Sequence, residues 1–500
     1  MNPGSSDYSA ENPWRALATL CLGFFMILLD LTIVAVANPA IMADLHTHIS
    51  GVVWVTSAYL LTFAVPLLVA GRLGDKIGPK RIYLTGLTVF TLASLWCGLS
   101  GSIGMLIAAR AVQGLGAAMM SPQTMAVITR IFPPAKRGQA MGAWGAVAGV
   151  ATLVGPLAGG VLVDGFGWEW IFFINVPVGV LAFVLALRFV PELPTRDHRF
   201  DIPGVVISAV GLFLLVFGLQ EGNRYDWSAG IWTMIVGGLV VLVGFVVYEA
   251  RSSHEPLVPL VLFRVRNFSL ANIAIMAMGA AVTGLMLPGF FYLEAVQEMS
   301  PTRAALVFAP MAVMSMVLAP VVGRLIDQMH PRYLPMIGFA CFSGGLFWLS
   351  AIMAVDTPVW QLVLPIMLMG IGNACVWPSL GATATHDLPV TDAGAGSGIY
   401  NTTRQVGSVL GSAAIGALIT ARLAAHGLSG GASEGQAGPL PEFVRKPFAE
   451  ALAESMLLPA SVLLIGLVAS VLFVRHRSSS RPVDRPSSQE VAAASPRLAG

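Results

Sequence analysis

Long apolar runs, separated by short polar segments, account for most of the chain. Each run has about the 20 residues that a helix needs to cross a bilayer, and none alternates apolar and polar residues as a barrel strand does. We therefore predict an all-α integral membrane protein with about fourteen transmembrane helices. The predicted spans are residues 14–37, 52–71, 82–100, 103–127, 139–162, 171–190, 203–220, 230–248, 268–293, 304–323, 334–354, 359–380, 395–420 and 456–474.

The composition indicates that lipid, not water, surrounds these runs. Apolar residues make up 56% of the chain and charged residues 11%, with a mean hydropathy of +0.77, whereas soluble domains carry about 25% charged residues. The net charge of +2 gives no support to a nucleic-acid partner. The four cysteines lie singly within apolar runs, which suits neither disulfides nor a zinc site. We expect no metal and no cofactor, and a monomer is one assembly that the sequence allows.

Lysine and arginine are distributed unevenly between the loops on the two sides. With the N-terminus inside, the inner segments hold 21 of the 28 Lys and Arg residues, the outer segments hold 5 and the spans hold 2. Cytoplasmic loops carry the basic excess in membrane proteins. We predict cytoplasmic termini in the plasma (inner) membrane, with tails at residues 1–13 and 475–500, the second disordered. The high Ala, Gly and Arg content indicates a bacterial source.

A charged turn occurs twice in the chain. Residues 71–81 read GRLGDKIGPKR and residues 323–332 read GRLIDQMHPR, an offset of 252 residues that aligns Asp75 with Asp327. The repeat predicts a 6+2+6 plan, and parallel repeats of this kind place a substrate site between the halves. The predicted parts are two six-helix bundles at 14–190 and 268–474, the second with an outer loop at 421–455, and two linker helices within 191–267.

Two charged residues lie where the bilayer should surround the chain. Asp30 and Arg110 are about 13 Å and about 12 Å below the outer ends of their spans, at 1.5 Å per helical residue. A charge inside the bilayer is costly and marks a functional site by default. We expect the two side chains to line a shared wet cavity, and a structural ion pair is the alternative. Because all eight histidines lie outside the spans, any proton must be carried by a carboxylate, and Asp30 is the first candidate.

Further polar side chains accompany these charges. Gln113 is one helical turn from the buried arginine, and Asn401, Arg404 and Gln405 form a polar stripe on the thirteenth span. These four residues are candidates for lining the cavity or contacting substrate, with hydrogen bonding between helices as the alternative. Glu294, at the outer end of the ninth span, is the second candidate for protonation, although we favour a solvated loop carboxylate.

The fifth span combines small residues with a proline. Gly155, Pro156 and Gly159 lie in its second half. Proline removes a helix hydrogen bond and kinks the span, and glycines let a neighbouring helix approach closely. We expect this stretch to be a kinked packing face.

Six stretches, in order along the chain, resemble signatures of the major facilitator superfamily and of its fourteen-span drug:proton antiporters. They are residues 29–34, 71–81, 110–118, 149–160, 168–179 and 401–407. The sequence departs from the family at Ala35-Val-Ala-Asn38-Pro39, where Asn-Val-Ala-Leu-Pro is usual, and at Glu169, where Arg is usual. Glu169 could favour cationic substrates, but a changed loop contact is the interpretation that we favour.

The resemblance implies a proton-coupled exporter of lipophilic drugs or antibiotics, cationic ones among them, that works by alternating access. An exporter dedicated to one metabolite or self-made antibiotic is the close alternative. A membrane-embedded enzyme is a remote one, and we expect no catalytic residues. The resemblance implies that Asp30 and Arg110 handle protons, that Gly71, Asp75, Gly78, Arg81 and Asp327 form the gating loops, and that Gly155, Pro156 and Gly159 shape the pathway.

Overall fold

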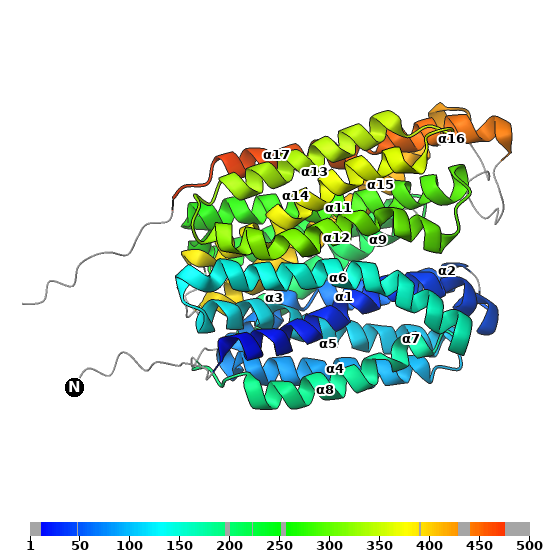
Figure 1. The fold of residues 1–500 in the computed structure, drawn as a ribbon. Helices are drawn as coiled ribbons and strands as arrows, with labels where there is room; N and C mark the ends of the chain where they lie inside the picture. Colours follow the sequence, from blue (N-terminus) through cyan, green and yellow to red (C-terminus); the bar gives the residue numbers. More distant parts are fainter. Residues whose placement is uncertain are drawn as a thin grey trace, which may run out of the picture.

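The computed structural model describes residues 12–47, 49–195, 201–222, 224–251, 257–389, 392–428 and 441–475. These residues form helices joined by short turns, and no strand occurs in these ranges. The helices lie roughly parallel in two groups, one from each half of the chain, with the start of α1 and the end of α17 at the same end of the bundle (Figure 1). We call this the terminal end, and the opposite end the far end.

The N-terminal half contains the first eight helices. Helices α2 and α3 are bent by 45° at a short break and together cover the second predicted span. Gly78, with a φ of +107°, connects α3 to α4 and lets α4 begin at a proline, because glycine tolerates this backbone region and proline suits a first helical turn. The helices are α1 (Pro13–Asp44), α2 (Ile49–Ala64), α3 (Leu67–Ile77), α4 (Pro79–Gly98), α5 (Ile103–Ile131), α6 (Pro134–Phe166), α7 (Trp170–Phe173) and α8 (Asn175–Phe189).

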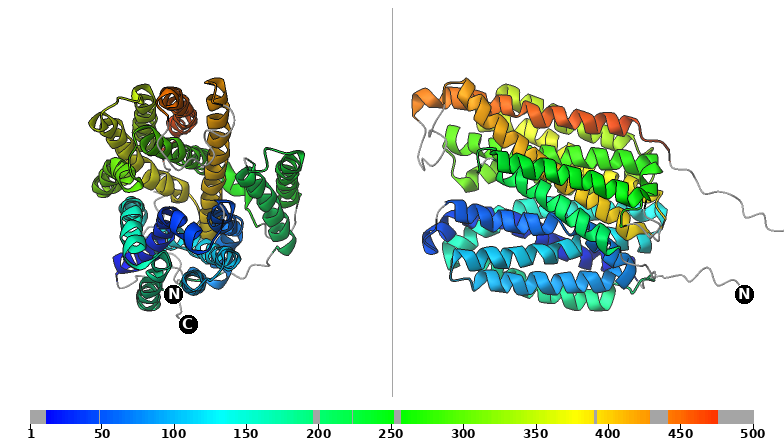
Figure 2. Two further views of the ribbon diagram at one scale, coloured as in Figure 1. Left: turned by 90° about the vertical axis from the view of Figure 1, so that its right-hand side faces the viewer. Right: turned by 180° about the vertical axis from the view of Figure 1, so that it is seen from behind.

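Two helices form a hairpin at the side of the bundle, α9 (Ile202–Glu221) and α10 (Ala229–Arg251). Figure 2 shows the hairpin, in green, beside the boundary between the two halves, where α9 contacts α2 and α15. Asp201 caps α9 by accepting a hydrogen bond from the backbone N–H of Gly204, and Tyr248 of α10 donates to the same carboxylate. The linker helices are therefore a peripheral pair fastened to each other.

The C-terminal half repeats the plan of the N-terminal half. Ser300 caps α12 by accepting from the backbone N–H of Arg303, a common way to satisfy the first N–H groups of a helix. The elements are η1 (Leu260–Arg264), α11 (Arg266–Phe291), the π-helical turn η2 (Tyr292–Val296), α12 (Pro301–Ile326), α13 (Tyr333–Ile352), α14 (Val359–His386), α15 (Ala393–Ala425), α16 (Glu442–Ser455) and α17 (Leu457–Val471).

All fourteen predicted spans overlap a helix or two consecutive helices. Eleven helices of the described residues are long and apolar enough to cross a membrane, and the bent pair α2–α3 makes a twelfth; α4 and α6 are outside this set. The predicted outer loop at 421–455 is wrong in part, because α15 continues to Ala425 and residues 442–455 form α16. Its residues 429–440, like tail residues 1–11 and 476–500, lie outside the described ranges.

The two halves meet tightly at the terminal end through glycines. A Cβ atom on Gly71 of α3 would lie 2.5 Å from the carbonyl oxygen of Gly394 in α15, and one on Gly142 of α6 would lie 2.8 Å from Cα of Gly323 in α12. Real Cβ atoms do not approach this closely, so both crossings require glycine. The 252-residue repeat makes α3 equivalent to α12. The crossing of α3 with α15 is therefore the counterpart of the crossing of α12 with α6.

Candidate functional site

A closed network of charged and amide groups lies inside the N-terminal half. Asp30 of α1 and Arg110 of α5 have no exposed surface, and Nη1 of Arg110 donates to Oδ2 of Asp30. Gln113 accepts from Nη1 of Arg110 at 2.7 Å and donates to Oδ1 of Asp30 at 2.9 Å. The guanidinium also donates to the carbonyl oxygen of Val55 and lies 4.2 Å from the ring centre of Tyr59. In this conformation the two charges lie in a packed network with no exposed surface, not in the wet cavity that we expected.

The sixth predicted span contributes Asn175 and the third contributes Ser94, two residues that sequence reasoning did not assign to this site. Nδ2 of Asn175 lies 3.3 Å from Oδ1 of Asp30 and donates to Oγ of Ser94 at 3.0 Å. Ser94 in turn donates to the carbonyl oxygen of Phe172. The carboxylate therefore has three side-chain donors around it, which offset part of the cost of burying its charge.

The antiporter stretch of α6 packs directly against α1 near the buried carboxylate. A Cβ atom on Gly155 would lie 1.9 Å from Oγ1 of Thr32, two residues after Asp30. The helix runs unbroken from Pro134 to Phe166, so Gly155, Pro156 and Gly159 all lie within one helix. Only glycine at position 155 allows α6 to approach α1 this closely.

The aspartate of the first charged turn connects the two halves. Asp75 accepts hydrogen bonds from the backbone N–H groups of Gly394 at 3.0 Å and Ala395 at 2.9 Å, in the first turn of α15. It also forms an ion pair with Arg130 of α5. The helix N-terminus and the arginine both favour the ionised carboxylate. Arg81 of the same turn is exposed.

The second copy makes the reciprocal contact. Asp327 accepts from the backbone N–H groups of Gly138 at 2.8 Å and Gln139 at 3.2 Å, in the second turn of α6. Its partial burial raises the pKa of the carboxyl group above its ordinary value, and these two hydrogen bonds oppose the increase. Each half therefore places one aspartate against a helix of the other half.

The polar stripe of α15 lies next to this boundary. Oγ of Ser121 in α5 lies 3.4 Å from Oδ1 of Asn401, which donates to the carbonyl oxygen of Ser397. Cζ of Arg404, one turn further along, lies 5.9 Å from the ring centre of Trp377 in α14. Gln405 is buried. Asn401 is thus a contact between the halves, whereas Arg404 faces the C-terminal half.

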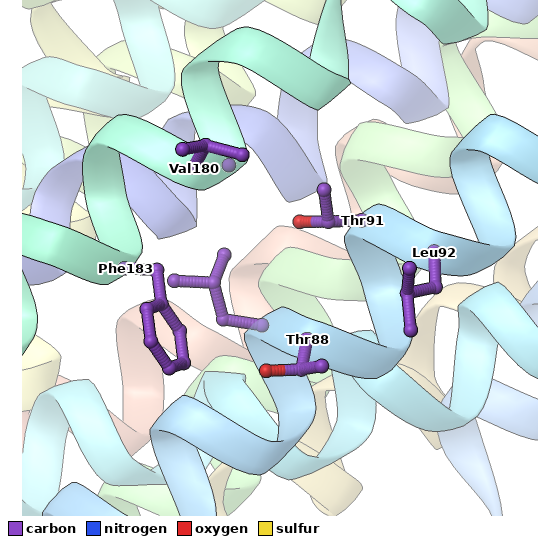
Figure 3. Close-up of a pocket in the computed structure, with 7 residues that line it drawn as sticks. Thr88, Thr91, Leu92, Val180 and Phe183 are labelled. Atoms are coloured by element: carbon purple, nitrogen blue, oxygen red, sulfur yellow. The ribbon is translucent and has the colours of Figure 1, made fainter.

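Glu294 and two pockets lie elsewhere. Glu294 is half-buried in the π-helical turn at the end of α11, and Glu169 directly precedes α7. Figure 3 shows a pocket of about 240 Å³ between α4 and α8, with Thr88, Val180 and Phe183 among its lining residues. A second, of about 220 Å³, lies between α11, α15 and α17. No site residue predicted from the sequence lines either pocket.

Comparison with known proteins agrees with this architecture. Residues 20–412 match the Major Facilitator Superfamily. The chain is 54% identical to the uncharacterized MFS-type transporter Rv1250 of Mycobacterium tuberculosis over 94% of this chain and 82% of that protein. It is 35% identical to the tetracenomycin C resistance and export protein of Streptomyces glaucescens, covering 82% and 77% of the two chains. The structure of the proton:xylose symporter XylE superposes with a TM-score of 0.62 at 14% identity, covering 93% and 95%.

Proposed function

Since the chain belongs to the Major Facilitator Superfamily of membrane transporters and is a multi-pass protein of the plasma membrane, we propose that it exports lipophilic drugs or antibiotics in exchange for protons. Several similar bacterial proteins are named as exporters or resistance proteins, among them a multidrug resistance protein of Mycobacterium tuberculosis that is 35% identical over 81% of this chain. The coupling ion is H⁺, no cofactor takes part, and the cycle is alternating access between the halves. Fourteen spans and cytoplasmic termini complete the proposal.

The buried network around Asp30 is the observation that carries the proton-coupling part. A carboxylate with no exposed surface, held by Arg110 and by the amides of Gln113 and Asn175, changes its bonding when it is protonated. Protonation removes the countercharge of Arg110, so the network must rearrange. An inward proton contributes about 2.3 kcal/mol per 100 mV of membrane potential. Coupling that rearrangement to movement of the halves lets proton flow drive export.

The contacts at the terminal end supply the gate in this cycle. Asp75 and Asp327 each bind backbone N–H groups across the boundary. With the terminal end on the cytoplasmic side, these contacts hold the inner side shut, and the structure corresponds to a state closed to the cytoplasm. Breaking them opens the inner side. Asn401, Gln405 and Arg404 line the pathway in this scheme, and Glu294 stays the second candidate for protonation.

An exporter dedicated to a single metabolite remains the second candidate, because one similar protein is named for a single antibiotic, the tetracenomycin C resistance and export protein. A resistance panel in cells with and without the gene separates the two. Protection against several unrelated lipophilic compounds supports the broad exporter, and protection against one alone supports the dedicated exporter.

The proposal is tested by measuring uptake of compounds into inverted membrane vesicles across which a proton gradient has been imposed. Compounds identified by the resistance panel should accumulate inside the vesicles when the interior is acidic, and a protonophore should release them. Accumulation that survives the protonophore would contradict proton coupling. A reporter fused to the C-terminus tests the topology, and an extracytoplasmic signal would contradict the even span count.

A further inference from the structure

Arg404 lies well inside α15, eleven residues after the helix begins at Ala393, or about 16 Å along its axis at 1.5 Å per residue. Its guanidinium carbon lies 5.9 Å from the ring centre of Trp377. The residue is partly exposed, while its Nε atom is fully buried. The side chain therefore presents part of its guanidinium to open space beside an indole ring.

The guanidinium has no acceptor among the described residues. Its buried Nε donates to no group, and the hydroxyl of Tyr400, one turn away on the same helix, is likewise buried without a hydrogen-bond partner. Such groups are uncommon in native structures, because a buried donor without a partner has lost its hydrogen bond to water and gained none in return. No ion pair to Arg404 exists within the described ranges, so its positive charge is uncompensated there.

Arg110, in the same protein, is an arginine whose charge is compensated by a carboxylate. It is completely buried, paired with Asp30 and bonded to Gln113 and to a backbone carbonyl, so its charge is compensated even though its Nη2 atom, like Nε of Arg404, has no hydrogen-bond partner. Arg404 has an aromatic neighbour in place of the carboxylate. The two arginines therefore serve different purposes, one inside a closed network and one open to a partner.

We propose that Arg404 and Trp377 bind the transported compound, and that this compound is an aromatic anion carrying a carboxylate, a sulfonate or a phenolate. The anionic group supplies the missing acceptor for the guanidinium, and charge-assisted hydrogen bonds of this kind are among the strongest in proteins. The indole provides a flat apolar surface for the ring of the ligand. This assignment rests on the proposed function and replaces the cationic preference that the sequence left open.

The position of Arg404 suits a substrate that contacts both halves of the transporter. Asn401, one turn nearer the terminal end, contacts Ser121 of the N-terminal half. A ligand bound to Arg404 therefore lies beside the boundary between the halves. Its negative charge compensates the positive charge of Arg404 there.

Three probes with one ring system test the assignment, namely 2-naphthoate, 2-naphthamide and 2-naphthylmethylammonium. Binding is measured by titration calorimetry on the purified full chain in detergent at pH 7. We expect the wild type to bind naphthoate at least tenfold more tightly than the other two. Arg404→Gln should lose this preference and Arg404→Lys should retain most of it, while Arg266→Gln, which changes an exposed arginine at the start of α11, should bind like the wild type. Thermal unfolding confirms that each variant is folded.

Three results would overturn the assignment. They are equal or tighter binding of the amide or the ammonium compound, an unchanged naphthoate preference in Arg404→Gln, and the absence of naphthoate binding by the wild type at millimolar concentration. Because binding is measured without a proton gradient, a failure of proton coupling leaves this readout intact. The two proposals can therefore fail separately.

Discussion

In the N-terminal half Asp30 is paired with Arg110 and Asp75 with Arg130, whereas in the C-terminal half Arg404 and Asp327 form no ion pair within the described ranges. The two halves share one repeated turn and equivalent helix crossings. Their charged residues nevertheless differ. The paired charges of the first half suit a group that changes partners when it takes up a proton, and the unpaired arginine of the second half suits a ligand.

The largest expected difference between the halves is in stability. Arg110→Gln leaves Asp30 buried without a cation, and breaking one side of a buried pair costs about 3–5 kcal/mol. Arg404→Gln removes a cation that has no carboxylate partner, so the free energy of unfolding should stay the same or increase. The measurement is the midpoint of thermal unfolding in one detergent.

A double variant controls for this comparison. Asp30→Asn combined with Arg110→Gln removes both charges and should recover most of the lost stability. Equal losses in Arg110→Gln and Arg404→Gln would show that the second arginine is also compensated, and the contrast between the halves would be wrong.

The two glycine crossings between the halves should behave alike, so the contrast between the halves is one of charge. Gly71→Ala and Gly142→Ala each place a Cβ atom within 2.8 Å of backbone in the other half. Overpacking of this kind costs about 1–3 kcal/mol, so each variant should close the terminal end poorly and transport roughly tenfold more slowly. Gly160→Ala is the control, because nothing lies within 4 Å of its Cβ position. A large loss in only one of the two crossings would contradict their equivalence.

A smaller difference is expected between the two aspartates of the charged turns. Asp75 binds the first turn of α15 and forms an ion pair with Arg130. Among the described residues, Asp327 accepts from two backbone N–H groups in the second turn of α6 and interacts electrostatically with His386 in place of an arginine. Because a hydrogen bond to a charged group contributes about 1.5–3 kcal/mol, Asp75→Asn should slow turnover about tenfold and Asp327→Asn about threefold. Initial transport rates at saturating substrate provide the measurement.

An exposed arginine outside the charged turns provides the control. Arg266→Gln, at the start of α11, should change the rate by less than about twofold, because exposed charges contribute little. Equal slowing by Asp75→Asn and Asp327→Asn would refute the asymmetry between the two turns.

The helical architecture could be predicted because lipid requires long apolar helices, and this requirement is visible in the sequence. The similar depths of Asp30 and Arg110 were visible too, since helical rise converts residue number into distance. Residues 442–455 fold as an amphipathic helix, although Glu442, Arg445 and Lys446 lower the local hydropathy and favour a loop in the sequence.

The partners of the predicted site residues could not be predicted in the same way. Asp75 binds backbone N–H groups of Gly394 and Ala395, and backbone donors carry no signature in the sequence. Arg130 and Asn175 come from helices whose rotation about their own axes depends on packing. The sequence showed which residues were unusual, and the fold determined what each one contacts.

Asp30 in the role of proton carrier is the central claim, and Asp30→Asn tests it most directly. The variant keeps a polar side chain that the amides of Gln113 and Asn175 can still bond, and it cannot ionise. Uphill accumulation driven by a proton gradient and exchange of labelled for unlabelled substrate are measured in the same inverted vesicles. We predict that Asp30→Asn loses accumulation and keeps exchange. Accumulation at the wild-type level in Asp30→Asn would contradict the account.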